Sequence, residues 1–525
     1  MSDSLPTTTS TTGPTTVSTT APRTSSTTAE SVVPAVVRPA VRSPKWDFIR
    51  RAGRSVNRPA VLPWLLAAIC FADYAALGLR DQARMLTSGF DLGIFDQAVR
   101  AYAHGQAPVT PLKGFGVNLL GDHFSPITAL LAPFYRIWPS ADMLLVAQAA
   151  LFALAVVPLT RWAMRALGTW PAVIIGACYG ASWGIASAAG FDFHEVAFGV
   201  LFLAFSATAL GERRLTAAAV WALPLLLVKE DMGLTTAVVG ILIATRGRRV
   251  LGLATAVAGL AGSLLEITVL IPMVNHHGYT YMNNVIPGAS SASSAWGVGG
   301  LHADVHALVH AVAGLPNPVK IDTLVMLLAP TAFVALRSPL IWLVVPTLAW
   351  RFATDNPSYW GTGYQYSAVL MPIAAAAFID GLIRWRRSGG RKSLIRSRIA
   401  LAVALAVTAF LLPSRPTFGV LCPSNWSNSS HVAAAHQLLD MIPDGATVAT
   451  TNRLAPQLTD RDTVTLLGTQ LNLLRRNSWI IADTQGPPFP GTAAQLNQWL
   501  VMAQQQDGFR VVAEDDGILL LERTA

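Results

Sequence analysis

The chain has 525 residues, of which 52% are hydrophobic and only 13% are charged, and its mean hydropathy is +0.45. Because a soluble globular protein carries roughly 25% charged residues, this composition excludes a soluble fold and indicates a surface that faces lipid. The formal net charge is +9, but the basic residues form short clusters between apolar runs, as in cytoplasmic loops beside anionic lipid. With no basic face interleaved with aromatics, the sequence indicates no nucleic-acid partner.

The N-terminal region, residues 1–45, is rich in Thr, Ser and Pro. Such a segment cannot bury enough apolar surface to fold, so we expect a disordered cytoplasmic tail. The first long apolar run begins near Val61, after the basic residues Arg50, Arg51 and Arg54. It lacks the short spacing of a cleavable signal peptide, so it is predicted to act as an uncleaved signal anchor.

Apolar runs recur through residues 46–413, and a spanning helix needs roughly 20 apolar residues. The candidate spans are 61–80, 141–160, 170–190, 196–211, 214–230, 232–246, 249–273, 321–336, 339–353, 366–384 and 398–413. Run 125–138 contains Pro126 and Pro133, which indicates a re-entrant or broken helix. The sequence therefore predicts an α-helical polytopic membrane protein with about 11 transmembrane helices.

The basic clusters determine the predicted orientation. With this set of spans, all of them fall on one side: Arg50–Arg54, Arg161 and Arg165, Arg213 and Arg214, Arg246 to Arg249, Arg337, and Arg384–Arg398. Basic loops stay in the cytoplasm, so we expect a multi-pass protein of the plasma membrane with a cytoplasmic N-terminus. The outer loops are then 81–124 and 274–320.

The tail, residues 414–525, has a different character. It is polar and contains short strand-like runs, Thr447–Thr451, Trp479–Asp483 and Gly517–Glu522. Because β-branched and aromatic residues bounded by turn residues are typical of strands, the tail is predicted to be a small α/β domain. By the orientation above, this domain is extracytoplasmic.

Two carboxylates lie in the first outer loop, Asp91 and Asp96. The apolar residues Leu92, Phe95 and Val99 recur at helical spacing, which predicts an amphipathic helix in the membrane interface. Residues five apart point in different directions on a helix, so only one of the two carboxylates is expected at a site. The structural alternative is that Asp91 is only an N-cap.

Three more polar clusters fall at the same membrane face. They are Asp122 and His123; Asp192, His194 and Glu195; and Lys229, Glu230 and Asp231. Ionisable residues at the ends of apolar helices are costly and usually functional, so these groups are candidates to hold a proton, a metal ion or a phosphate. The alternatives remain a capping turn before Ser125 for the first cluster and mutual ion pairing for the last.

Other polar motifs carry less weight. His276 and His277 lie near Tyr279 and Tyr281, and an aromatic run from Tyr359 ends in Gln365 and Tyr366. His302, His306 and His310 would share one helical face, but the glutamate of a zinc-protease helix is absent, so no metal site is predicted there.

No phosphate-binding P-loop, Gly-x-Ser-x-Gly elbow or dinucleotide fingerprint occurs in the sequence. ATP-driven transport is therefore not expected. If the protein transfers a group, a lipid-linked donor reached from within the membrane fits better than a nucleotide on a soluble domain.

Several of these motifs resemble the DUF2079 family of bacterial predicted membrane proteins. The matching stretches are Phe90–Gln97, Gly121–Pro126, Phe191–Glu195, Lys229–Asp231 and the tail motif Ile442–Gly445, within about residues 60–490. Where the family is expected to have a His-Tyr pair, this chain has Gln365 and Tyr366. The family is in turn similar to the GT-C superfamily of polyprenyl-phosphate-sugar glycosyltransferases, which implies a GT-C-like fold.

The resemblance implies roles for specific residues. Asp91 would be the general base that takes a proton from an acceptor hydroxyl. The leaving polyprenyl phosphate would need positive charge, for which Lys229, His123 and His194 are available, or a divalent metal ion held by carboxylates. The expected partners are the lipid bilayer, a polyprenyl-phosphate-linked sugar, and a cell-envelope glycan or protein acceptor.

The expected function is therefore a membrane-embedded glycosyltransferase acting at the outer face. One alternative is a transporter or flippase of a lipid-linked envelope intermediate, with the same charges as a proton relay. Such relays need ionisable groups near mid-membrane, and Glu266, inside span 249–273, is the notable candidate. An inactive scaffold for another envelope enzyme is the third possibility.

Overall fold

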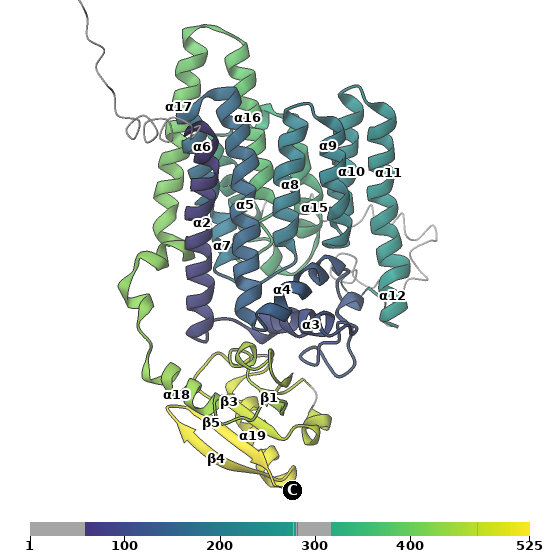
Figure 1. The fold of residues 1–525 in the computed structure, drawn as a ribbon, viewed down its shortest axis with the longest axis vertical. Coiled ribbons are helices and arrows are strands. Elements are labelled where there is room, and N and C mark those ends of the chain that lie inside the picture. Colours follow the sequence, from purple (N-terminus) through teal and green to yellow (C-terminus); the bar gives the residue numbers. More distant parts are fainter. Residues whose placement is uncertain (1–57, 277, 280, 282–316, 470, 525) are drawn as a thin grey trace, which may run out of the picture. The chain divides into compact units, whose positions relative to one another are not determined.

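Helices run side by side through most of the molecule, and a small sheet follows in the tail (Figure 1). The structure is a computed structural model that describes residues 58–276, 278, 279, 281, 317–469 and 471–524. The described residues belong to one compact unit. The helical class and the C-terminal sheet are as the sequence predicts.

Four helices are long and apolar enough to cross a membrane, and they cover Val61–Ala83, Ala141–Leu167, Arg249–Val274 and Gly390–Ser414. A fifth span arises if α6 (Thr169–Gly180) and α7 (Trp183–Ala189), bent by 42°, cross as one unit. Shorter apolar helices cover Val196–Gly211, Leu215–Leu227, Met232–Thr245 and Pro339–Ala353. By length and composition, the described part of the chain thus supports four or five spans, where about 11 were expected.

Prolines explain why several predicted spans are short. Pro224 lies in the 3-10 turn η4 (Leu223–Leu227), directly after α9 (Leu215–Ala222). Pro330 lies in η7 (Ala329–Thr331), which follows α14 (Pro318–Leu328). Proline lacks an amide hydrogen and clashes with the preceding turn, so it interrupts α-helical hydrogen bonding. After η7 the chain turns through left-handed Ala332 before η8 (Val334–Arg337), which divides the predicted span 321–336.

The proline-rich run 125–138 is broken as predicted. It forms the 3-10 helix η3 (Pro126–Leu131) and the short helix α4 (Ala132–Ile137). Before it, the segment 84–124 forms the π-helical turn η1 (Gly89–Gly93), the amphipathic helix α3 (Ile94–Ala103) and the 3-10 turn η2 (Leu119–Gly121). The predicted amphipathic helix is therefore present, but a π turn carries Asp91 ahead of it.

Glycines allow α10 (Met232–Thr245) and α11 (Arg249–Leu265) to approach closely. A Cβ atom at Gly240 would lie 2.4 Å from the backbone nitrogen of Ala256, and one at Gly252 would lie 2.3 Å from that of Ala244. No side chain fits at these distances, so small residues set the separation of the helices, as is common in membrane proteins. α11 continues through the π-helical turn η5 (Glu266–Leu270) into α12 (Ile271–Val274).

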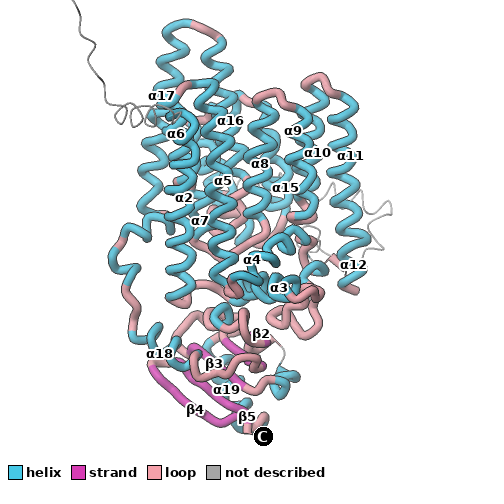
Figure 2. Tube along the Cα trace, in the orientation of Figure 1, coloured by secondary structure: helices cyan, strands magenta, loops and turns pink. Residues whose placement is uncertain are grey.

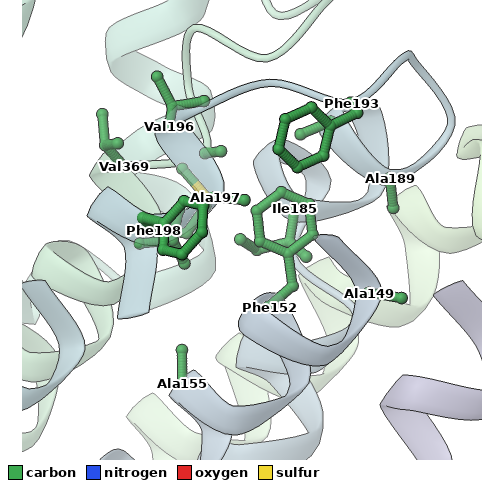
Figure 3. Close-up of a cluster of buried hydrophobic side chains, with 14 of the residues drawn as sticks. Ala149, Phe152, Ala155, Ile185, Ala189, Phe193, Val196, Ala197, Phe198 and Val369 are labelled. Carbon is green, nitrogen blue, oxygen red and sulfur yellow. The ribbon is translucent and has the colours of Figure 1, made fainter. Parts of the chain in front are cut away.

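A buried hydrophobic cluster supports the turn between α7 and α8 (Val196–Gly211) (Figure 3). Phe152 of α5 (Ala141–Leu167), Ile185 of α7 and Phe193 of the turn are fully buried. Full burial of a large apolar side chain contributes roughly 1.5–3 kcal/mol. Phe193 therefore anchors the short segment that carries the polar residues on either side of it.

The remaining membrane-region helices complete the bundle. They are α2 (Arg58–Ala83), α15 (Val345–Ala353), preceded by the 3-10 helix η9 (Pro339–Val344), α16 (Leu370–Arg387) and α17 (Gly390–Leu411). The 3-10 turn η10 (Pro357–Tyr359) lies in the loop between α15 and α16. Short 3-10 turns, η11 (Leu412–Ser414), η12 (Pro416–Leu421) and η13 (Pro423–Trp426), lead from α17 into the tail.

The tail is an α/β unit with one five-stranded sheet in the order β2-β1-β3-β5-β4 (Figure 2). Its elements are α18 (Ser430–Leu439), β1 (Thr447–Thr450), η14 (Ala455–Gln457), β2 (Thr463–Leu466), η15 (Leu471–Arg476), β3 (Trp479–Asp483), α19 (Ala493–Gln506), β4 (Phe509–Asp515) and β5 (Ile518–Arg523). β2, β1 and β3 are parallel, whereas β5 pairs antiparallel with β3 and β4. The buried β-branched residues of β1 and β3 explain their central position.

Hydrogen bonds join the tail to α3. The guanidinium of Arg100 in α3 donates to the carbonyl oxygens of Asp462 (2.7 Å), Arg461 (3.0 Å) and Thr459 (3.1 Å). The amide of Gln97 donates to the carbonyl oxygen of Val464 in β2 (2.9 Å). The tail therefore holds α3 through backbone carbonyl oxygens. Because these acceptors belong to the main chain, a side-chain substitution in the tail would not remove them.

Candidate active site

A cavity of about 750 Å³ lies where the polar clusters between the helices meet. Its ionisable lining comprises Asp91, Lys113, Asp122, His123, His194, Glu195, Lys229, Glu230, Asp231, Tyr279, Tyr281, Tyr359 and Tyr366. Gln365 also lines it. The structure thus brings together ten of the twelve candidates that the sequence singled out, from segments more than 250 residues apart. Asp96 and Asp192 do not line the cavity.

Asp91 lies on one wall, next to His194. The Nε2 atom of His194 is 3.2 Å from Oδ1 of Asp91, and the hydroxyl of Ser88 donates to Oδ2 of Asp91 (3.2 Å). Burial would raise the pKa of Asp91, but the hydrogen bond and charge of His194 outweigh it and lower that pKa below its ordinary value. Asp91 is therefore held as a carboxylate.

His194 is poised to be an imidazolium. Burial would lower its pKa, but the hydrogen bond and negative charge of Asp91, together with Glu195, raise it above its ordinary value. Its Nδ1 atom lies 3.1 Å from the carbonyl oxygen of Asp192. Because both ring nitrogens face acceptors, only the protonated ring can donate to both.

Asp192 supports the turn that carries Asp91. Both of its carboxylate oxygens lie 3.2 Å from the backbone nitrogen of Ser88, the residue that precedes η1. Burial and the negative charge of Asp91 raise the pKa of Asp192 to about 7. The sequence placed Asp192 among the binding residues, but here it positions the turn that presents Asp91.

Asp96 does not line the cavity, so the structure does not place this second catalytic candidate beside Asp91. Asp96 belongs to the first turn of α3 and is fully buried, whereas Asp91 lies in η1. Burial raises its pKa to about 7. The sequence argument that only one of the two carboxylates faces a site agrees with this geometry, since five residues do not return a helix to the same face. The alternative for Asp91, an N-cap, does not apply, because Ser88 occupies that position without a side-chain cap.

The opposite wall carries the Lys229–Asp231 cluster. The ammonium of Lys229 lies 3.3 Å from Oε1 of Glu195, which is only 2% exposed. Glu230 is held by three groups: Nδ1 of His123 (2.7 Å), the hydroxyl of Tyr279 (2.7 Å) and the backbone nitrogen of Phe124 (3.1 Å). The sequence left mutual ion pairing as the alternative explanation of this cluster. Ion pairs are present, but they join Lys229 to Glu195 and Glu230 to His123, which belong to other segments of the chain.

Two residues that the sequence did not single out contribute to the site, one by lining the cavity and one by holding a loop that lines it. Lys113 forms an ion pair with Asp122, and it places a second ammonium group at the cavity. Arg351 of α15 is fully buried and donates to the carbonyl oxygens of Tyr359 (2.7 Å) and Gly361 (2.7 Å), so it holds the aromatic loop that ends in Gln365 and Tyr366. An arginine within an apolar span is itself a sign of function, so the sequence could have identified Arg351 as a candidate.

Some sequence candidates lie elsewhere. Tyr281 lines the cavity and stacks on His123 with ring centroids 4.3 Å apart, whereas His276 does not line it. His277, His302, His306 and His310 lie outside the described residues.

One wall of the cavity is apolar. Leu260, Leu264 and Ile267 of the α11–η5 segment line it, and Leu260 and Leu264 are also about half exposed at the surface of the bundle, at 52% and 47%. A cavity with a charged side and an apolar side suits an amphiphilic ligand with a charged headgroup.

Four of the five carboxylates that line the cavity are engaged in the pairs Asp91–His194, Asp122–Lys113, Glu195–Lys229 and Glu230–His123. The fifth, Asp231, is in none of the ion pairs found among the described residues. Across the described ranges, no group of three His, Cys, Asp or Glu side chains is arranged to hold a metal ion. The described residues thus offer no set of three such donors for the divalent ion that the resemblance left open.

The fold is similar to that of ArnT. ArnT from Cupriavidus metallidurans, in its crystal structure bound to undecaprenyl phosphate, is similar over 88% of this chain and 98% of that chain, with a TM-score of 0.51 and 13% identity. The oligosaccharyltransferase of Archaeoglobus fulgidus in the apo form has a TM-score of 0.41 and 11% identity, over 81% of this chain and 70% of that one. The likeness to ArnT, at this low identity, shows a shared fold.

Residues 82–520 match the family described as "Predicted membrane protein (DUF2079)", and the chain belongs to this family. No curated protein matches it.

Proposed function

We propose that this protein is a membrane-embedded glycosyltransferase that moves a sugar from a polyprenyl-phosphate donor to a cell-envelope acceptor. The observation that carries the proposal is the single cavity in which Asp91, kept ionised by His194, faces cationic side chains beside an apolar wall. The shared fold with ArnT, whose structure holds undecaprenyl phosphate, supports a lipid-linked phosphate as the ligand.

In the proposed reaction, Asp91 accepts the proton of an acceptor hydroxyl as that oxygen bonds to the anomeric carbon of the sugar. The bond between the anomeric carbon and the phosphate oxygen breaks, and polyprenyl phosphate leaves with the electron pair. Attack opposite the leaving group inverts the anomeric carbon. Although the lowered pKa of Asp91 makes it a weak base, the acceptor oxygen becomes strongly acidic as the new bond forms.

The leaving phosphate needs positive charge. Lys229 and Lys113 line the cavity and supply ammonium groups there, and the imidazoles of His123 and His194 line it too. Charges fixed in place before the reaction stabilise a developing anion more than mobile water does. The apolar wall formed by α11 and η5 would receive the first isoprene units, because it borders the lipid-facing surface of the bundle.

We also propose that the cavity opens to the extracytoplasmic side. Arginines gather at the other ends of the same helices, as in Arg213 after α8 and Arg246 after α10. Basic ends of spanning helices stay in the cytoplasm. The tail, which is bonded to the first outer loop near Asp91, would then be extracytoplasmic and would contribute to acceptor binding.

The test is an analysis of lipid-linked sugars in cells that lack the protein and in cells that carry Asp91→Asn. We expect one polyprenyl-phosphate sugar to accumulate in both, with loss of that sugar from an envelope glycan or protein. The matched control is Asp322→Asn, which removes an exposed carboxylate of α14 that does not line the cavity. Full complementation by Asp91→Asn would rule out Asp91 as the base.

One observation favours the alternative of a transporter or flippase. Glu266 is buried within the α11–η5 segment, and its Oε2 atom has no hydrogen-bond partner among the described residues. Its helix also changes to π geometry at this residue, a feature frequent at functional sites. Lipid-intermediate movement that is lost in Glu266→Gln and kept in Asp91→Asn would favour this alternative.

A further inference from the structure

A second, larger cavity lies at the other ends of the helices that carry the candidate active site. Its volume is about 1130 Å³, and its lining comes from α5, α8, α9 and α16 and the segments that follow α8 and α10. Asp231 directly precedes α10, whereas Arg246 follows it and lines the second cavity. At 1.5 Å per residue, α10 separates the two by ~21 Å, so the cavities are distinct.

The lining of this cavity is strongly basic. Eight arginines line it, against two carboxylates, Glu212 and Asp380. Glu212 pairs with Arg165 and Arg214, and Asp380 pairs with Arg384. Both carboxylates are therefore already occupied, and the cavity keeps an excess of six positive charges.

Five of these arginines have no carboxylate within ion-pair distance in the described part of the chain: Arg161, Arg213, Arg246, Arg386 and Arg387. Arg386 donates to the carbonyl oxygen of Leu167 (2.7 Å) and to the hydroxyl of Ser397 (3.1 Å), which fixes its guanidinium at the wall. These guanidinium groups come from separate helices and line one cavity.

In the turn after α8, Arg213 has a backbone conformation that is unfavourable for residues other than glycine. Arg213 has a φ of 61°, in the left-handed region that favours glycine. The preceding Gly211 packs on Trp162, whose ring would lie 2.1 Å from a Cβ atom at that position. Close packing of this turn on Trp162 thus directs the Arg213 segment to the cavity rim, and strained positions of this kind are found where a ligand is held.

The cavity also has aromatic surfaces. Trp162, Phe205 and Trp221 line it, and the rings of Phe205 and Trp221 stack with centroids 4.4 Å apart. Planar guanidinium groups bind phosphate oxygens in pairs, and the aromatic rings offer an apolar surface to the organic part of a phosphate ester. The volume is enough for a headgroup with more than one phosphate.

We propose that this second cavity is a binding site for a phosphate-bearing ligand, either the headgroup of an anionic lipid or a soluble phosphorylated compound. The arginines without carboxylate partners bind the phosphate oxygens, and the aromatic wall contacts the attached group. The site does not depend on the proposed glycosyl transfer, because none of its residues lines the candidate active site.

The test is a thermal-stability titration of the purified full-length protein in a neutral detergent. The probes are phosphatidylglycerol, phosphatidylcholine as the neutral lipid, and inorganic pyrophosphate in solution. The variant Arg213→Gln/Arg246→Gln removes two arginines of the cavity. Arg391→Gln/Arg396→Gln is the matched control, because it removes two exposed arginines of α17, near the same end of the bundle, that do not line the cavity.

We expect phosphatidylglycerol or pyrophosphate to raise the melting temperature of the wild type at a half-saturating concentration that increases about tenfold or more in the cavity variant, for a loss of at least about 1.4 kcal/mol. The control should behave as the wild type. A response to phosphatidylglycerol alone identifies a lipid headgroup, and a response to pyrophosphate identifies a soluble phosphate compound. Should the double variant fail to fold, Arg387→Gln replaces it.

Three results would overturn the proposal. They are no stabilisation of the wild type by either anion, equal stabilisation by phosphatidylcholine, and an equal loss of affinity in the cavity and control variants. The last would mean that the arginines act only through the general charge of this membrane face.

Discussion

The imidazole of His194 joins two acceptors, with Nε2 3.2 Å from Oδ1 of Asp91 and Nδ1 3.1 Å from the carbonyl oxygen of Asp192. It connects the turn between α7 and α8 to η1, although Asp91 and His194 are 103 residues apart in the chain. Phe191 stacks on the same ring with centroids 5.4 Å apart, and Phe95 meets it edge-on at 5.7 Å. These contacts give the ring one orientation, so its effect on Asp91 is built into the fold.

The pH dependence of transfer should reveal this pair. Asp91 must be deprotonated to act as a base, so activity is present above its pKa and is lost as pH falls through it. His194 lowers the pKa of Asp91. In His194→Gln that pKa should rise, and the acid limb of the profile of kcat/KM should move towards neutral pH.

The control for this prediction is His104→Gln, which changes an exposed histidine that contacts only its own helix in the described structure. Its profile should coincide with that of the wild type. An acid limb that does not move in His194→Gln would mean that a group other than Asp91 sets it.

Substitutions of Lys229 and Glu195 should compensate each other in melting temperature but not in transfer activity. Removing one partner of a buried ion pair leaves an uncompensated charge and costs about 3–5 kcal/mol. Lys229→Met should therefore lower the melting temperature, and Lys229→Met/Glu195→Gln should recover most of that loss. Neither should restore transfer, because both lack the ammonium proposed to stabilise the leaving phosphate.

The measurement is a melting curve in detergent together with a transfer assay on each variant. Glu195→Gln alone, which keeps the ammonium, is the comparison for activity. Transfer at the wild-type rate in the double variant would remove Lys229 from the proposed mechanism.

Arg351 should resist even a conservative substitution. Its guanidinium donates from three nitrogens to Tyr359, Gly361 and Ser367, a geometry that the single ammonium of lysine cannot reproduce. Each lost hydrogen bond from a charged donor costs about 1.5–3 kcal/mol. Arg351→Lys should lower the melting temperature and reduce transfer, since the loop to Tyr366 forms part of the cavity.

Arg337→Lys is the control for Arg351. Arg337 lies over the ring of Trp385 at 5.4 Å and does not line the candidate active site. Equal effects of the two substitutions on transfer would contradict a specific role of Arg351 in holding the loop.

The contact between η1 and the tail should be needed for activity. The backbone nitrogen of Gly89 donates to the carbonyl oxygen of Asn452 (2.7 Å), and a Cβ at Gly89 would lie 2.4 Å from that of Ala455. Gly89→Ala must therefore push the tail away from η1. We expect a reduction in transfer of at least about tenfold, as a shift of roughly 1 Å at a reacting group can cost more than that.

Gly363→Ala is the matched control, because a Cβ at Gly363 would meet nothing within 4 Å. Limited proteolysis would show whether the tail of Gly89→Ala is more accessible than that of the wild type. A variant with normal transfer and normal protection would mean that η1 does not depend on this contact.

The sequence by itself determined the class of the protein and the segments that matter. Hydropathy is a local property, so apolar runs predicted the positions of the helices, and polar residues at their ends predicted Asp91, His194 and the Lys229 cluster as candidates. The lengths of the uninterrupted helices were less predictable, since a proline such as Pro224 can either bend a span or end an α-helix within it.

Only the tertiary structure decided which of these residues meet. It separated Asp91 from Asp96, assigned Asp192 to support, and added Lys113 and Arg351 to the site. It also gathered the arginines of several loops around one cavity. The physical reason is that a pKa or an ion pair depends on distances between segments a hundred or more residues apart, and those distances are set by helix packing, which no local pattern encodes.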